Sequence, residues 1–194
     1  MNTGDTAFMM ICAALVFFMT PGLAFFYGGL VRRKNVCNTI MACVAIMGLS
    51  VVMWTLFGYS LSFGGNHAGI IGDFRWFGFN GVGMEAGPYA DSIPHLVFCA
   101  FQMMFAMITP ALITGSLVGR MKFKALFLFV AIWSVIVYYP MTHMVWGDGG
   151  FLAAIGSVDF AGGDVVHISS GISALVLAII LGRRRGYEHT TYRI

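Results

Sequence analysis

The residues best suited to chemistry lie in the second half of the chain, inside or beside long apolar segments. His167 lies near the start of one such segment, about 24 Å along a helix axis from Arg183 at its other end. An ionisable side chain at that depth in a membrane indicates function, because leaving it unpaired is costly. The alternative is a neutral histidine bonded to a backbone carbonyl or a serine, and position alone does not separate the two.

Two aspartates flank the glycine-rich stretch before this segment. Asp164 has the position of an N-cap, whose carboxylate would accept free N–H groups at the start of a helix. Asp159 lies one turn farther out and has less local justification. It would orient the loop or supply negative potential to a cation-attracting site.

Aromatic and amide side chains supply the other candidates. Trp146 ends an apolar segment, where an indole either anchors the chain at a membrane interface or offers its face to a small cation. Phe105 and Gln102 lie in the middle of another apolar segment, where packing is the ordinary role of an aromatic ring.

The composition indicates the environment in which these residues work. The chain has 194 residues, of which 59% are hydrophobic and 10% charged, and its mean hydropathy is +0.84. A soluble domain carries about a quarter charged residues. Disulfide scaffolds, disordered linkers and nucleic-acid modules are therefore poor fits, and an all-α membrane protein is predicted.

Five runs without Asp, Glu, Lys or Arg are each long enough for one membrane-spanning helix of about 20 residues. We therefore predict five transmembrane helices, and we treat residues 1–194 as one unit. The predicted spans lie near 8–31, 36–60, 94–118, 125–146 and 164–182. The stretch from Ser60 to His67 is predicted as a loop.

The signs of the charges predict the orientation. Ten of the eleven basic residues fall in three clusters on one side of a five-span chain, and seven of the eight acidic residues fall in the other loops. Basic residues near span ends stay in the cytoplasm. We therefore expect a multi-pass protein of the cytoplasmic membrane, with the N-terminus outside and the C-terminus inside.

Two functional classes remain from the residues alone. One is a conducting or transporting bundle with a pore lined by His167. The other is a membrane electron carrier that holds haem through histidines such as His95, His143 and His167. An enzyme is not expected, because the serines lack a nucleophile elbow and no zinc-type HxxEH pattern is present.

Four stretches of the sequence resemble the ammonium transporter family (Amt/Mep/Rh), in family order and most closely its bacterial Amt type. They are Pro21-Gly-Leu-Ala-Phe-Phe-Tyr-Gly-Gly-Leu-Val-Arg-Arg-Lys-Asn35, Phe101-Gln-Met-Met-Phe-Ala-Met-Ile-Thr109, His143-Met-Val-Trp-Gly147 and Asp159-Phe-Ala-Gly-Gly-Asp-Val-Val-His-Ile-Ser-Ser-Gly-Ile-Ser-Ala174. The resemblance implies an eleven-span homotrimer with one narrow pore per subunit, between two inverted five-span halves. This chain would be the N-terminal half.

The resemblance also implies roles for individual residues, with no cofactor or metal. Trp146 would be the aromatic wall of an outer ammonium-recruitment site, and Phe105 one of two stacked phenylalanines that close the pore below it. Asp159 would be the buried carboxylate that shapes the site. His167 would be the first of two pore histidines, and Gln102 would lie near the pore and help relay a proton. Ammonium would be deprotonated, and ammonia and the proton would cross separately.

The main departure from the family pattern is length. The second pore histidine and the second gating phenylalanine belong to a C-terminal half, which we expect in the same or in a second chain. A PII-type regulator or a signalling domain is a further expected partner. Some family members are ammonium sensors, and the sequence leaves that alternative open.

Overall fold

The computed structural model describes residues 1–184, and within them five helical spans are long and apolar enough to cross a membrane. Their bounds are Thr3–Gly29, Arg33–Phe63, His95–Leu117, Phe123–Ala154 and Gly163–Leu181. The five spans expected from the charge-free runs are therefore confirmed, with differences at their ends. Expectations for the C-terminal tail, including Arg185, Arg193, Glu188 and the location of the C-terminus, lie outside the described residues.

Several spans are divided into shorter elements, among which 3-10 and π-helical segments carry the prefix η. In chain order the elements are α1 (Thr3–Gly29), η1 (Arg33–Asn35), α2 (Val36–Met53), η2 (Trp54–Gly58), α3 (Tyr59–Phe63), η3 (Phe77–Phe79), β1 (Ala86–Gly87), β2 (Ala90–Pro94), α4 (His95–Leu117), α5 (Phe123–Trp133), η4 (Ser134–Tyr138), α6 (Tyr139–Trp146), α7 (Phe151–Ala154), η5 (Gly163–Ile168) and α8 (Ser169–Leu181).

The second span continues beyond its expected end. Ser60–Phe63 was expected to begin a loop, but these residues form most of α3 and are all buried. Their burial explains the error, because α3 packs against α6 and inside a bundle the backbone must satisfy its own hydrogen bonds. The helix ends only where the N–H of Gly64 bonds to the carbonyl of Ser60 at 2.7 Å.

Within residues 1–184, π-helical segments interrupt the second and fourth spans, and a third one begins the fifth span. In the fourth span the π segment η4 ends two residues before Pro140, which has no N–H to continue the regular ladder. In the fifth span the carbonyl of Gly162 accepts hydrogen bonds from Val166 (3.1 Å) and His167 (2.9 Å), so the π turn carries His167 itself. Such turns are frequent at functional sites.

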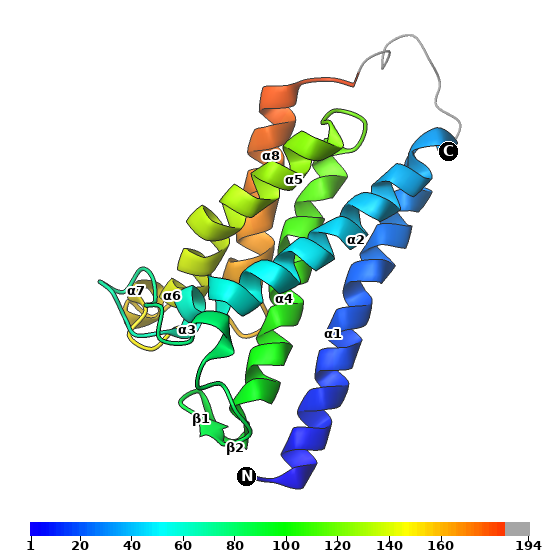
Figure 1. Cartoon of the computed structure of the whole chain (residues 1–194). Coiled ribbons are helices and arrows are strands. Elements are labelled where there is room, and N and C mark those ends of the chain that lie inside the picture. The colour runs from blue at the N-terminus through cyan, green and yellow to red at the C-terminus, as the bar shows by residue number, and fades with distance from the viewer. Residues whose placement is uncertain (185–194) are drawn as a thin grey trace.

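Helix α4 is the centre of the bundle, since it contacts α1, α2 and α8, and the second and fourth spans cross beside it (Figure 1). The core between these spans is rich in aromatic side chains that are fully buried, among them Trp54, Tyr59, Tyr138 and Tyr139. Outward-facing side chains of α1 and α8 are apolar and exposed, including Phe18, Phe25, Ile179 and Ile180. A surface of this kind suits lipid or neighbouring helices.

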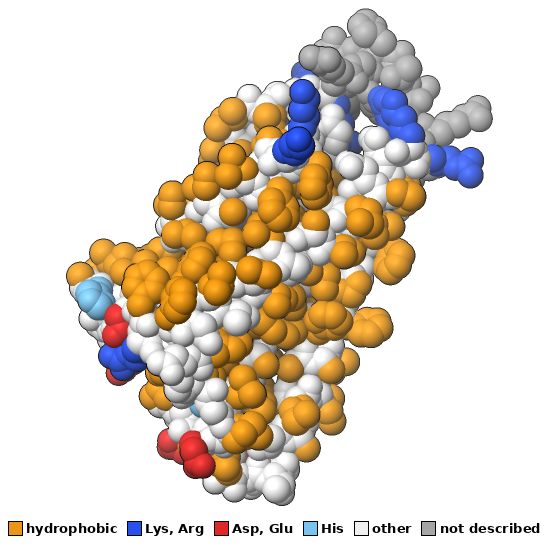
Figure 2. Space-filling model, in the orientation of Figure 1, with side chains coloured by type: hydrophobic (Ala, Val, Ile, Leu, Met, Phe, Trp, Pro, Cys, Tyr) orange, Lys and Arg blue, Asp and Glu red, His pale blue; other side chains and the backbone are white. Residues whose placement is uncertain are grey.

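The charged side chains lie at the two ends of the bundle (Figure 2). The basic end carries Arg32, Arg33, Lys34, Arg120, Lys122, Lys124, Arg183 and Arg184. We call the opposite end, formed by residues 64–94 and 147–163, the cap end. It contains η3, α7 and a small antiparallel sheet in which Ala86 pairs with Pro94 and Gly87 with Ala90. This separation of charges is what a bundle with membrane-spanning helices requires.

Candidate functional site

Trp146, Phe105 and Asp159, which were expected to work together, meet at the cap end. Trp146 is the last residue of α6, and its indole Nε1–H donates to the backbone carbonyl of Asp159 at 3.2 Å. The Phe105 ring, from the middle of α4, meets the indole in an edge-type contact with centroids 6.1 Å apart. The indole is therefore fixed at its nitrogen and along one side, and it remains half-buried.

Asp159 caps the start of the fifth span with both carboxylate oxygens. Oδ1 accepts the N–H groups of Gly162 (2.6 Å) and Gly163 (2.7 Å), and Oδ2 accepts those of Asp164 (2.8 Å) and Val165 (2.9 Å). These are N–H groups at the start of a helix, which have no partner inside it. A carboxylate has about four acceptor positions, so backbone donors fill them all.

Asp164 was expected to be the N-cap, and that expectation is wrong. The cap position is Gly162, and Asp164 lies within the first turn of η5, where its carboxylate accepts the hydroxyl of Ser157 at 2.6 Å. Gly162 has a positive φ of 84°, a left-handed conformation that folds the loop back so that Asp159 reaches the helix start. A Cβ at Gly162 would also meet the side chain of Val166 at 2.9 Å.

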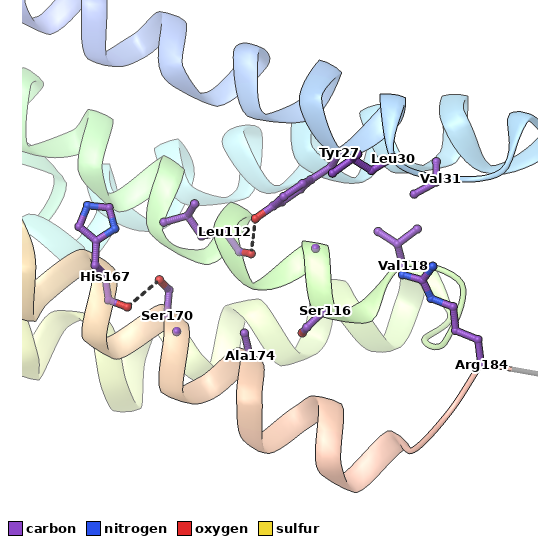
Figure 3. Close-up of a pocket in the computed structure, with 12 residues that line it drawn as sticks. Tyr27, Leu30, Val31, Leu112, Ser116, Val118, His167, Ser170, Ala174 and Arg184 are labelled. Atoms are coloured by element: carbon purple, nitrogen blue, oxygen red, sulfur yellow. Dashed lines mark hydrogen bonds between the residues drawn. The ribbon is translucent and has the colours of Figure 1, made fainter. Parts of the chain in front are cut away.

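His167 lies in η5 with an exposed imidazole, at one end of a cavity of about 480 Å³ between α1, α4 and α8. Figure 3 shows the ring at the entrance to a row of side chains that runs toward Arg184 at the basic end. Tyr27 from α1 crosses this cavity and donates its hydroxyl to the carbonyl of Leu112 at 3.0 Å. The cavity thus extends from the His167 level toward the basic end.

The cavity is lined by small and polar side chains on its α4 and α8 walls, including Ser116, Ser170 and Ala174. Gly115 permits the close approach of α1, because a Cβ there would lie 2.7 Å from the Tyr27 ring. Tyr27 was not among the residues predicted for the site. A tyrosine in an apolar span could have indicated this position, because its buried hydroxyl needs a hydrogen-bond partner.

Gln102 lies on α4 one turn before Phe105. Its Oε1 is buried and has no hydrogen-bond partner among residues 1–184. Within the described part of the chain, no hydrogen bond or ring contact joins Gln102 or His167 to Trp146 or Asp159. The five candidates therefore divide into a cap-end group of Trp146, Phe105 and Asp159, and two separate polar positions.

Two of the three histidines considered for haem, His95 and His143, already have protein partners. The Nε2 of His95 is hydrogen-bonded to the hydroxyl of Tyr59, and His143 contacts Ser62 and Asn66 through its two ring nitrogens. The engaged nitrogens are not free to bind iron, so the contacts of His95 and His143 do not favour axial ligation of a haem.

Asp73 and Tyr89, in the first loop of the cap end, have shifted pKa values. Burial raises the pKa of Asp73, but hydrogen bonds from the backbone of Arg75 and Gly65 and the nearby Arg75 guanidinium lower it more, so the net shift is downward. Arg75 forms an ion pair with Asp73 at 3.0 Å. Burial raises the pKa of Tyr89, whose hydroxyl donates to the carbonyl of Phe63 and accepts from the N–H of Asp148.

Comparison with known proteins places this geometry in a family. Residues 7–194 match the sequence model of the Ammonium Transporter Family. An ammonium transporter of Bacillus subtilis is 51% identical over 185 residues, which cover 95% of this chain and 45% of the relative. The crystal structure of Candida albicans Mep2 matches with a TM-score of 0.82 and 31% identity, over 94% of this chain and 40% of that one.

A structure described as a sensor Amt protein also matches, with a TM-score of 0.82 and 28% identity, over 96% of this chain and 47% of that one. The chain thus spans about half the length of the relatives it matches. The match of the family model over nearly the whole chain, together with these identities, identifies its family. The chain belongs to the ammonium transporter family.

Proposed function

We propose that this chain forms the ammonium-recruiting part of a pore that conducts ammonia across the cytoplasmic membrane. The observation that carries the proposal is the Trp146 site. An indole is held by Phe105 at its side and by the Asp159 carbonyl at its nitrogen. A half-buried indole face attracts a small cation by about 0.5–2 kcal/mol, and by more where water is excluded.

The role of Asp159 in this proposal is indirect. Its carboxylate oxygens are already occupied by four backbone N–H groups, so it is a poor direct ligand for ammonium. It holds the helix that carries His167 and places its own carbonyl against Trp146. It also contributes negative charge near the entrance, which favours a cation at short range.

The pore itself would start beyond Phe105. A bare ammonium ion has a large desolvation cost in an apolar pore, whereas ammonia does not. His167 would conduct ammonia through hydrogen bonds, and the proton would leave the ion near the entrance and cross by a separate route. Gln102, whose buried oxygen has no hydrogen-bond partner among residues 1–184, is the candidate to help relay that proton.

A second half is needed to enclose this path. His167 is exposed at one end of the cavity between α1, α4 and α8, and the matched relatives are about twice as long. We expect the other half in the same or in a second chain. We further expect a homotrimer, with the cap end outside, the basic end in the cytoplasm, and a PII-type regulator or a signalling domain as a partner.

The test is ammonium-evoked current in proteoliposomes that contain the complete pore. Wild-type protein should give a saturable current, and His167→Ala should abolish it or change its selectivity for ammonium. Unchanged current and selectivity in His167→Ala would remove this residue from the pore. The similarity to a sensor Amt structure makes sensing the second candidate, and saturable ammonium binding without current would favour it.

A further inference from the structure

His143 is fully buried, and both of its ring nitrogens face oxygen acceptors. Nδ1 lies 3.0 Å from the backbone carbonyl oxygen of Ser62 in α3, and Nε2 lies 3.2 Å from Oδ1 of Asn66 in the following loop. A backbone carbonyl oxygen can only accept hydrogen bonds. The Nδ1 contact therefore requires a proton on Nδ1.

The orientation of the Asn66 side chain is fixed by its other contacts. Its Nδ2 donates to the carbonyl of Gly149 at 2.9 Å, and its Oδ1 accepts the N–H of Gly69 at 2.7 Å. A flipped amide would place NH₂ against an N–H group and oxygen against a carbonyl, so both contacts would become repulsive. Oδ1 therefore faces His143, and the Nε2 contact also requires a proton.

A neutral imidazole has one N–H group and satisfies one of these acceptors, whereas the imidazolium satisfies both. The surroundings act in both directions. Burial of the ring, with a smaller contribution from the charge of His67, opposes a positive charge on His143 more strongly than the Ser62 carbonyl and the charges of Asp148 and Asp73 favour it. Arg75, which is paired with Asp73, reduces that carboxylate's effect.

The contacts of His143 also fix the end of the helix that carries Trp146. Trp146 lies three residues beyond His143 on α6. Asn66 holds the turn after the helix through Gly149, and the neighbouring Gly69 carbonyl accepts the N–H of Phe151 at 2.8 Å. The His143 contacts thus join α3, the loop of the cap end and the segment that leads from Trp146 to Asp159.

We propose that His143 is a proton-binding positioning residue for Trp146, which holds the ammonium-recruitment site more firmly when the ring carries a second proton. The proposal rests on the recruitment function proposed above. Acidification at the cap end would add the hydrogen bond to Asn66, restrict the end of α6 and strengthen ammonium binding. His143 does not touch the ammonium ion in this scheme, and Trp146 does.

The first experiment compares wild-type protein with His143→Gln as complete pores in proteoliposomes. The half-saturating concentration of ammonium ion and the maximal current are measured at about pH 5.5 and about pH 8 on the cap-end side, a range that spans imidazole titration. His67→Gln is the matched control. It also removes a histidine next to Asn66, but His67 is exposed and only one of its ring nitrogens, Nδ1, faces an acceptor, the carbonyl of Gly65.

At about pH 5.5 we expect His143→Gln to raise the half-saturating concentration about fivefold, the factor that corresponds to one net hydrogen bond. The ratio should approach one at about pH 8, with the maximal current retained. His67→Gln removes a charge that opposes protonation of His143, so it should not raise the half-saturating concentration at either pH. An equal ratio at both values, as a purely structural role would give, or a ratio that falls on acidification, would overturn the proposal.

A second measurement needs no variant. In wild-type protein with ¹⁵N-labelled histidine, the two ring nitrogens of His143 should both carry protons at about pH 5.5, a state that NMR identifies. An unprotonated Nε2 throughout the range would overturn the proposal, even if His143→Gln failed to fold. Absence of any wild-type ammonium current would instead count against the proposed function, while the NMR result would still decide the state of His143.

Discussion

Replacing Asp159 by asparagine tests whether the carboxylate caps the fifth span with both of its oxygens. The amide oxygen of Asp159→Asn would still accept two backbone N–H groups, on the side of Gly162 and Gly163. The NH₂ group would then point at the N–H groups of Asp164 and Val165, which now bond to Oδ2 at 2.8 and 2.9 Å. Two attractive contacts would become donor–donor contacts. Asparagine, although it has nearly the same shape, should therefore lose half of the cap.

The expected magnitude follows from the number of bonds lost. A hydrogen bond to a charged group contributes about 1.5–3 kcal/mol when buried and less when water reaches it. Because Asp159 is half-buried, the loss of two such bonds should cost about 2–4 kcal/mol of local stability. Amide hydrogen exchange of η5, followed by mass spectrometry or NMR, should then speed up about 30- to 1000-fold, since each 1.4 kcal/mol is a factor of ten.

Asp164→Asn is the matched control, because that carboxylate accepts a hydrogen bond from Ser157 and does not cap the helix. It should leave exchange in η5 within about fivefold of the wild type, the effect of one ordinary hydrogen bond. Wild-type protection in Asp159→Asn, or a larger effect in Asp164→Asn, would refute the assignment of the cap to Asp159.

Three further substitutions test other parts of the fold by thermal unfolding. Gly115→Leu should cost about 1–3 kcal/mol by overpacking against Tyr27, whereas Gly48→Leu, where a Cβ meets nothing within 4 Å, should cost far less; equal losses would contradict the close approach. Arg120→Gln removes a guanidinium that donates to two carbonyls at the end of α8, so a loss of about 0.5–2 kcal/mol is expected, and no loss would deny it a capping role. Because the pKa of Asp73 is lowered from 3.8 on folding, its stabilisation is present above pH 3.8 and is lost as pH falls through the lowered value. Wild type and Asp73→Asn should therefore differ at neutral pH and converge in acid, and a difference that persists in acid would contradict this.

Apolar runs and charge placement were sufficient to predict the five spans, because a membrane-spanning helix satisfies its backbone hydrogen bonds internally. The interruptions within the spans were not predictable in the same way. The π segments η2 and η5 contain no proline, so no local residue type announced them. The helical conformation of Ser60–Phe63 depends on contact with α6, a segment far away in the sequence.

The two aspartates show the limit of reasoning from sequence spacing at the site. Asp164 lies where an N-cap is ordinarily found, and Asp159 lies too far from the helix for that role in an extended chain. The left-handed Gly162 shortens the path, so that Asp159 reaches four N–H groups and Asp164 turns to Ser157.

Contacts between distant segments were beyond sequence reasoning altogether. Trp146 and Phe105 belong to different spans, and only the resemblance to a family suggested that they share a site. The pairing of His143 with Asn66, which are 77 positions apart, has no local signature. A polar side chain in an apolar span signals that a partner must exist, but it does not identify that partner.

The recruitment of ammonium by Trp146 is the central claim, and the most direct test is the concentration dependence of ammonium-evoked current in the complete pore. Trp146→Leu removes the indole face and keeps an apolar side chain. The account predicts a half-saturating ammonium concentration raised about 2- to 30-fold, the range that corresponds to a cation–π contact of about 0.5–2 kcal/mol, with the protein still folded. A half-saturating concentration equal to that of the wild type would contradict it.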